Sequence, residues 1–98
     1  TVDEPDILVA HFGGATKEEA TRLVYKIRDA GIGARLAFAR ERRSMKSQMR
    51  EGNRHQVKLM LIMGESELES GEVTVRPLDG GDQLRVASEK IVEWLKQH

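Results

Sequence analysis

Positive charge gathered between residues 40 and 58 is the first feature of this sequence that could do chemistry. The stretch holds seven basic and two acidic residues, whereas the 98-residue chain carries 16 of each and no net charge. Grouped lysine and arginine side chains bind the phosphate groups of nucleic acids. The alternative is the solvated face of a helix with a chance excess of arginine. The residues for which we predict phosphate contact are Arg40, Arg42, Arg43, Lys46, Arg50 and Arg54.

No pattern in the sequence predicts a catalytic or metal site. Four glutamates between residues 65 and 72 could supply a general acid–base pair, but alternating acids in a turn are more typical of a solvated surface. The three histidines lack the spacing of metal ligands, and no local signature of a nucleophilic triad is present. We therefore expect no catalytic residue, no metal ion and no cofactor in this chain.

The loop "HFGGAT" at residues 11–16 lies where glycine-rich loops hold phosphates, between an apolar run and a helical pattern. It lacks the G-x-G-x-x-G and G-K-[ST] motifs that make such loops specific. Its glycines are therefore expected to form only the turn. A small nucleotide-binding enzyme that uses this loop stays open as an alternative.

Composition favours a globular cytoplasmic domain. Hydrophobic residues make up 39% of the chain and charged residues 33%, and there is no cysteine, which fits a reducing compartment. No apolar run approaches the roughly 18 residues that span a membrane, and no signal peptide opens the chain. Residues 1–5, "TVDEP", are expected to be the remnant of a linker, and residues 6–98 a single domain.

The order of apolar patterns predicts five strands. Continuous apolar runs at 6–12, 33–39 and 57–64 are typical of strands that are covered on both faces. Alternating segments at 72–78 and 83–87 flank the turn "DGGD" and predict a half-buried hairpin. We interpret residues 65–71 as a turn that leads into this hairpin.

Three helices are predicted between and after the strands. Thr16 and Glu19 have the spacing of a capping box, and Gly31 with Ile32 is typical of a helix end. A second helix is expected to begin at Ser44, with Met45 and Met49 on its apolar face, and a third at Ser88. Helices between strands make the first three strands parallel. The expected fold is a three-layer α/β domain with a mixed five-stranded sheet, three parallel strands and a C-terminal hairpin.

The stretch from residue 44 to 76 resembles the anticodon-binding domain of class IIa aminoacyl-tRNA synthetases, and among them it is most similar to the histidyl enzymes. The likeness extends to "KEEATRLVYKIRDAGI" upstream and "GGDQLRV" downstream, and so covers nearly the whole chain. The matching positions are Ser44, Met45, Lys46, Gln48 and Met49 in a helix, Gly64, Glu65, Glu67 and Leu68 in a turn, and Gly71, Val73, Val75 and Arg76 in a strand.

The resemblance implies a function and a set of contacts. It assigns base contacts in the tRNA anticodon to Glu67 and Arg76, with Glu65 beside them, while the basic residues hold phosphates. A carboxylate accepts hydrogen bonds from base amino and imino groups, and an arginine donates to a base edge. Without the resemblance, Glu67 and Arg76 are equally explained by an ion pair on the hairpin.

The sequence departs from the family pattern at the end of the second helix and in the first loop. Gln56 and Val57 stand where the family commonly ends its second helix with Gly-Ala, which removes the usual glycine cap. The first loop reads "HFGG" where the family commonly has proline, leucine and glycine.

The resemblance further implies a parent protein. The domain would belong to a cytoplasmic, homodimeric histidyl-tRNA synthetase whose catalytic domain uses ATP and histidine. The class II catalytic motifs are absent from these residues, so the chain alone is not expected to aminoacylate tRNA. Two alternatives remain: a protein-interaction or dimerisation module of a synthetase-like regulatory protein, and the equivalent domain of a threonyl or prolyl enzyme.

Overall fold

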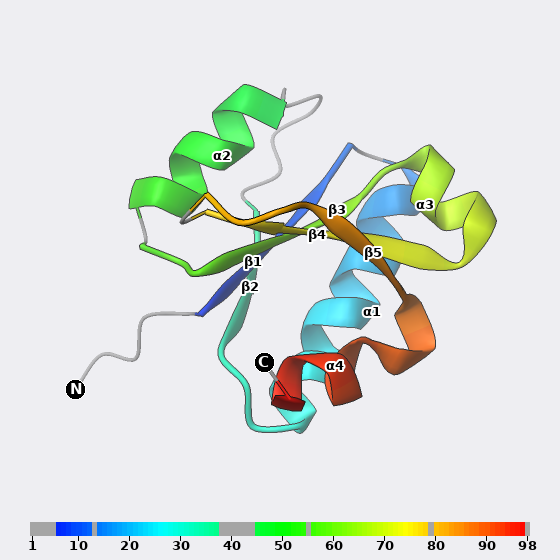
Figure 1. The fold of residues 1–98 in the computed structure, drawn as a ribbon. Helices are drawn as coiled ribbons and strands as arrows, with labels where there is room; N and C mark the ends of the chain where they lie inside the picture. Colours follow the sequence, from blue (N-terminus) through cyan, green and yellow to red (C-terminus); the bar gives the residue numbers. More distant parts are fainter. Residues whose placement is uncertain (1–5, 13, 38–44, 55, 79, 98) are drawn as a thin grey trace.

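A single mixed sheet organises the molecule. The computed structural model describes residues 6–12, 14–37, 45–54, 56–78 and 80–97. Five strands run in the order β2-β1-β3-β4-β5, with β1 parallel to β2 and β3, and β4 antiparallel to both β3 and β5 (Figure 1). The expected mixed sheet is therefore confirmed. The strands are β1 (Ile7–His11), β2 (Ala34–Leu36), β3 (Leu59–Met63), β4 (Glu72–Pro77) and β5 (Leu84–Ala87).

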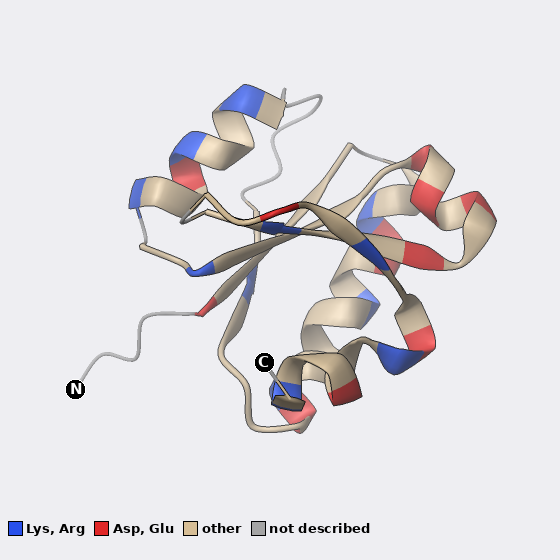
Figure 2. Cartoon of the chain, in the orientation of Figure 1, with Lys and Arg blue, Asp and Glu red and all other residues tan. Residues whose placement is uncertain are grey.

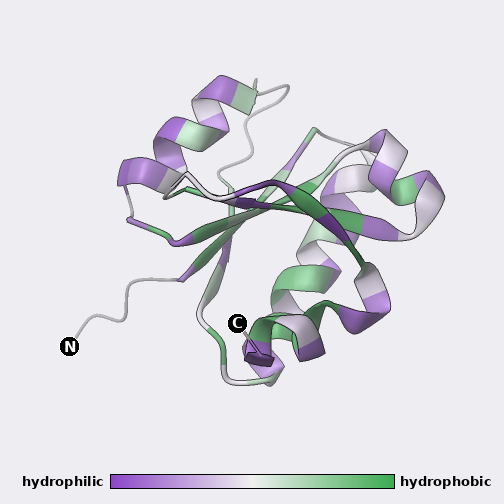
Figure 3. Ribbon diagram, in the orientation of Figure 1, coloured by the Kyte–Doolittle hydropathy of each residue, from purple (hydrophilic) through white to green (hydrophobic). Residues whose placement is uncertain are grey.

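Helices cover the two faces of the sheet unequally. Helices α1 (Ala15–Asp29) and α4 (Ile91–Gln97) lie on one face, and α2 (Met45–Arg54) lies on the other (Figure 1). Alternate residues of β1 enter two separate cores: Val9 packs with α1 and α4, whereas Leu8 packs with the α2 side. Hydrophobic residues concentrate in the strands, while α2 is largely hydrophilic (Figure 3).

Helix α1 begins where the sequence predicts, but not by the predicted cap. Gly14 is the N-cap residue, with a φ of 58°, and no side chain caps the helix. The Thr16 hydroxyl instead accepts a hydrogen bond from the backbone N–H of Phe12, 3.0 Å away. The proposed capping box of Thr16 and Glu19 is therefore wrong, because Glu19 pairs with Arg22. At the other end the prediction is confirmed, since Gly31 has a φ of 84° and Ile32 packs on the core.

The described residues contain four α-helices rather than three. The extra helix, α3 (Glu65–Ser70), occupies the segment that we interpreted as a turn. Six residues are too few to show the apolar periodicity that identifies a helix in a sequence. Local contacts form it instead: the Gly64 N–H donates to Oε1 of Glu67, and Gly71 ends the helix with a φ of 72°.

The last helical segment differs slightly from its prediction. Ser88 was expected to cap it, but Ser88 is the first residue of a short 3₁₀ helix, η1 (Ser88–Lys90), and Ala87 precedes it as the cap. The predicted cap at Ser44 lies outside the described residues. Residues 1–5, the predicted linker remnant, lie outside them as well.

Helix α2 ends at a strained residue. Gln56 has a φ of 57°, in the left-handed region where glycine is favoured. Its backbone N–H donates to the carbonyl of Asn53, and the N–H of Val57 donates to the carbonyl of Gly52, both at 3.1 Å. The chain thus makes the usual helix-ending turn without the glycine that adopts a left-handed conformation free of steric strain.

Replacing Gln56 by glycine should therefore stabilise the fold. We expect the substitution Gln56→Gly to raise the free energy of unfolding by about 0.5–1 kcal/mol. Glycine removes the steric strain of the left-handed conformation, and this gain is larger than the loss that comes from the greater entropy of the unfolded chain. Urea unfolding followed by circular dichroism measures the change. The control Gln56→Ala keeps the β-carbon and should bring no gain; equal gains for both variants would show that strain is not the cause.

Candidate nucleic-acid interface

A side-chain amide fixes α2 to the end of β1. Oε1 of Gln48 accepts from the N–H of His11 (2.9 Å), and Nε2 of Gln48 donates to the carbonyl of His11 (2.8 Å). The amide therefore pairs with the β1 backbone as a neighbouring strand would, and both partners are buried. A β-carbon on Gly52 would lie 3.1 Å from Leu78, so the helix also packs closely at its other end.

The buried face of α2 determines which residues it presents to solvent. Met45 and Met49 pack against the core, as predicted from their spacing. Lys46, Arg50 and Arg54, four residues apart, lie on the exposed side. None of their side chains makes a hydrogen bond or ion pair with another described residue. Figure 2 shows basic residues along α2 and acidic residues gathered on α3. The other predicted phosphate contacts, Arg40, Arg42 and Arg43, lie outside the described residues.

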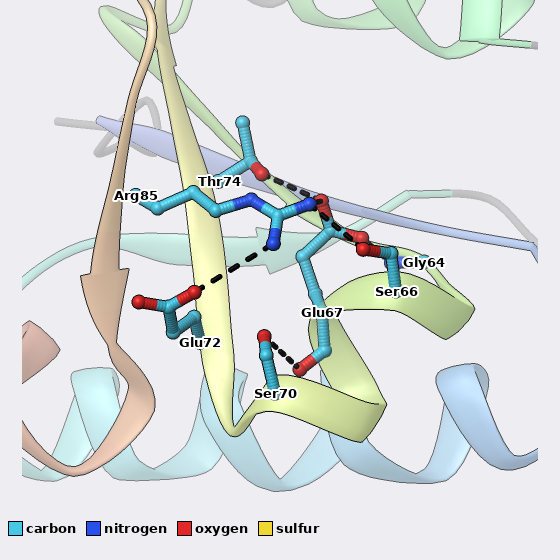
Figure 4. Close-up of polar contacts among 7 residues, drawn as sticks. All are labelled: Gly64, Ser66, Glu67, Ser70, Glu72, Thr74 and Arg85. Atoms are coloured by element: carbon cyan, nitrogen blue, oxygen red, sulfur yellow. Dashed lines mark hydrogen bonds and ion pairs between the residues drawn. The ribbon is translucent and has the colours of Figure 1, made fainter.

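Glu67 is the centre of a polar cluster that joins α3 to β4 and β5 (Figure 4). Its Oε1 accepts from the N–H of Gly64 at 3.0 Å. Its Oε2 accepts from the hydroxyl of Thr74 at 2.6 Å and from Nη2 of Arg85 at 3.2 Å. A carboxylate has about four acceptor positions, so these bonds leave about one for a ligand.

Arg85 forms the solvent side of this cluster. Its Nη2 also donates to Oγ of Ser66 at 2.9 Å, and its Nη1 lies 3.6 Å from Oε1 of Glu72. The Arg85 side chain is 42% exposed, whereas that of Glu67 is 11% exposed. Arg85 is therefore the donor to Glu67 that a ligand from solvent would meet first.

These contacts set the ionisation of Glu67. Burial alone raises the pKa of its carboxyl, but the hydrogen bonds from Thr74 and from the backbone amides, together with the charge of Arg85, outweigh burial and lower the pKa below its ordinary value. The carboxylate is thus held ionised and ready to accept hydrogen bonds at neutral pH.

Arg76 lies apart from this cluster but on the same face of the sheet. Val73 and Val75 enter the core under α1, so Thr74 and Arg76, which alternate with them, point to the α2 face. Arg76 is half-buried, and its side chain makes no hydrogen bond or ion pair with another described residue. Glu67 therefore forms its ion pair with Arg85 and not with Arg76, which was the alternative that the sequence left open. Glu65, the first residue of α3, is exposed.

Arg85 and Thr74 belong to this cluster, although they are not among the predicted site residues. The alternation in "QLRVA" could have placed Arg85 on the face opposite Leu84 and Val86. Nothing in the sequence shows that β5 pairs Arg85 with Thr74, because that register depends on the hairpin.

Other kinds of site find little support in the described part of the chain. It has no group of three or more potential ligands that could hold a metal ion. None of its helices has both the length and the apolar character needed to cross a bilayer. A cavity of about 440 Å³ lies at the beginning of β3, beside Val57, Leu59 and Trp94.

Comparison with known proteins identifies the family of this domain. The chain belongs to the anticodon-binding-domain family, whose model, described as an anticodon binding domain, matches residues 6–98. It is 37% identical over 92 residues to histidine–tRNA ligase of Oceanobacillus iheyensis, a match that covers 94% of this chain and 21% of that protein. It is 30% identical over 91 residues to histidine–tRNA ligase of Bacillus subtilis, covering 93% of this chain and 21% of that protein.

Solved structures share the fold. Histidyl-tRNA synthetase of S. aureus superposes with a TM-score of 0.85 at 24% identity, over 97% of this chain and 24% of that one. The RNA-binding domain of threonyl-tRNA synthetase from Cryptosporidium parvum Iowa II superposes with a TM-score of 0.86 at 19% identity, over 97% and 24% of the two chains. This chain therefore spans about a fifth of the length of the ligases that it resembles.

The bonds to Glu67 should make stability depend on pH. Because the folded-state pKa is lowered, the ionised carboxylate stabilises the fold above its ordinary pKa, and this contribution is lost as pH falls through the folded-state value. We expect Glu67→Gln to lower the free energy of unfolding by about 1–3 kcal/mol at pH 7 and by less in acid. Urea unfolding at pH 7 and below pH 4 measures both. Glu65→Gln, at an exposed position of the same helix, is the control and should change little; a loss independent of pH would contradict this account.

Proposed function

We propose that this chain recognises the anticodon stem-loop of a histidine tRNA. Membership in the anticodon-binding-domain family carries the proposal. The surface supports it, because an exposed cationic helix, α2, and the groups of α3 and β4 that suit base edges lie on one face of the sheet. Phosphate contacts would position the loop, and base contacts would specify it.

Each predicted residue has a role in this proposal. Lys46, Arg50 and Arg54 on α2 contact phosphates, together with Arg40, Arg42 and Arg43 before the helix. Arg76 donates to a base edge, because its guanidinium has no described partner to give up. Glu67 accepts from a base through its remaining acceptor position, and Glu65 stands exposed beside it.

The parent protein in this proposal is a cytoplasmic, homodimeric histidine–tRNA ligase. The sequence identity to such ligases and the small share of their length that the chain covers both support this assignment. The remainder of the parent would bind ATP and histidine and carry out aminoacylation, and this domain would need no cofactor. A protein-interaction module that kept the fold and lost RNA binding is the competing function.

Fluorescence anisotropy with a labelled histidine-tRNA anticodon stem-loop tests the proposal. We expect Arg76→Gln to remove about 1–3 kcal/mol of discrimination against a stem-loop with a changed anticodon, because a base contact is lost. Arg22→Gln is the matched control, since Arg22 is an exposed arginine on α1, on the opposite face. Failure of the unchanged chain to bind either RNA at low salt would favour the interaction module.

The residues of α2 should affect binding in a different way. Replacing Lys46, Arg50 or Arg54 by glutamine should weaken both stem-loops equally, because phosphates carry no sequence information. Each replacement should reduce the slope of log affinity against log salt by about 0.7–0.9. The same anisotropy titrations over a salt series measure this slope, with Lys96→Gln on α4 as the control. A loss of discrimination with an unchanged slope would assign α2 to base contact instead.

A further inference from the structure

We propose that Phe12 is a base-stacking residue, which takes the flat face of one unpaired nucleobase of the RNA loop. The inference deepens the proposed function and rests on it. The low aromatic content of the chain, 4%, gives no sign of a stacking surface in the sequence. The structure supplies one ring at the place where the base contacts are expected.

The ring of Phe12 is exposed although it is large and apolar. The residue is 37% exposed and belongs to neither buried core cluster. Of the described residues, the other large exposed hydrophobic ones are Tyr25 on α1 and Leu84 on β5. A partly exposed aromatic ring has apolar surface in contact with water, and a stacked ligand would bury this surface.

Hydrogen bonds hold the backbone at Phe12 and at the residue before it. Its own N–H donates to the hydroxyl of Thr16 at 3.0 Å. The preceding residue, His11, is bound through its N–H and its carbonyl by Gln48. A ring on a fixed backbone loses little conformational freedom when a base stacks on it, so the position is pre-organised for binding.

The ring lies beside the carboxylate of Glu67. Strand β1 pairs His11 with Met63, so Phe12 and Gly64 follow side by side at the ends of their strands. A β-carbon on Gly64 would lie 2.8 Å from Oε1 of Glu67 and 3.7 Å from Cδ2 of Phe12. The ring and the carboxylate are therefore separated by no more than the sum of these two distances.

This proximity assigns two contacts to one base. A base stacked on Phe12 brings its polar edge toward Glu67 and toward Arg85, whose Nη2 lies 3.2 Å from Oε2 of Glu67. Sites for single-stranded RNA combine these two contacts: an aromatic side chain takes the face of the base, and polar groups read its edge. A leucine at this position would fill a similar space without a π face.

Substitutions at Phe12 distinguish a role in stacking on RNA from a role in packing within the domain. We expect Phe12→Leu and Phe12→Ala to weaken binding of the histidine-tRNA anticodon stem-loop by about five- to 150-fold, and Phe12→Trp to keep or strengthen it. Tyr25→Ala, at an exposed aromatic residue on α1, is the control and should leave the affinity unchanged. Circular dichroism during thermal unfolding checks that each variant is folded.

A scan with abasic nucleotides identifies the stacked base. Removing that base should weaken binding to the unchanged chain and should have little effect on binding to Phe12→Leu. If the unchanged chain distinguishes anticodons while Phe12→Leu binds equally well, the stacking inference is overturned and the proposed function stands. If the unchanged chain binds neither RNA, both are overturned. Stacking would also be overturned if Phe12→Leu weakened binding but no abasic stem-loop weakened binding to the unchanged chain.

Discussion

Burial of β1 on both faces is the constraint on which the rest of this structure depends. All five residues of the strand are buried, so each face must be covered by a helix and each edge by another strand. Helix α1 satisfies one face and α2 the other, while β2 and β3 pair with its edges. Phe12, the residue that follows the carboxyl end of the strand, then lies at the surface beside Gly64.

Helix α2 is a polar helix on an apolar face, and this explains how it is attached. Its core-facing side offers two half-buried methionines and the Gln48 amide, which completes the hydrogen bonding of the His11 backbone. Hydrogen bonds fix the position of a helix more sharply than apolar contact, because they are directional. The cationic side of α2 is therefore held toward solvent at a defined place relative to the end of β1.

The charge of the chain is separated across the face that we assign to RNA. Basic residues line α2, and acidic residues lie on α3, so the neutral total hides a polarised surface (Figure 2). Phosphates would be attracted to the first and repelled by the second, while base amino and imino groups can bind carboxylates. In the proposed complex, this separation would orient a single strand with its backbone toward α2 and its bases toward α3. Glu67 links this orientation to stability, because its carboxylate also holds α3 to β4 and β5.

The sequence by itself determined the five strands, the two helices between the parallel strands and the cationic side of α2. These follow from periodicity and local composition, which act over a few residues. The sequence did not reveal α3, because six residues are too few to show the apolar periodicity of a helix. This helix also depends on the hydrogen bond from the Gly64 N–H to the carboxylate of Glu67. Only the tertiary structure decided that Glu67 pairs with Arg85 rather than Arg76, and that Phe12 lies beside Gly64. Both depend on strand register, and register is set by contacts between residues far apart in the chain.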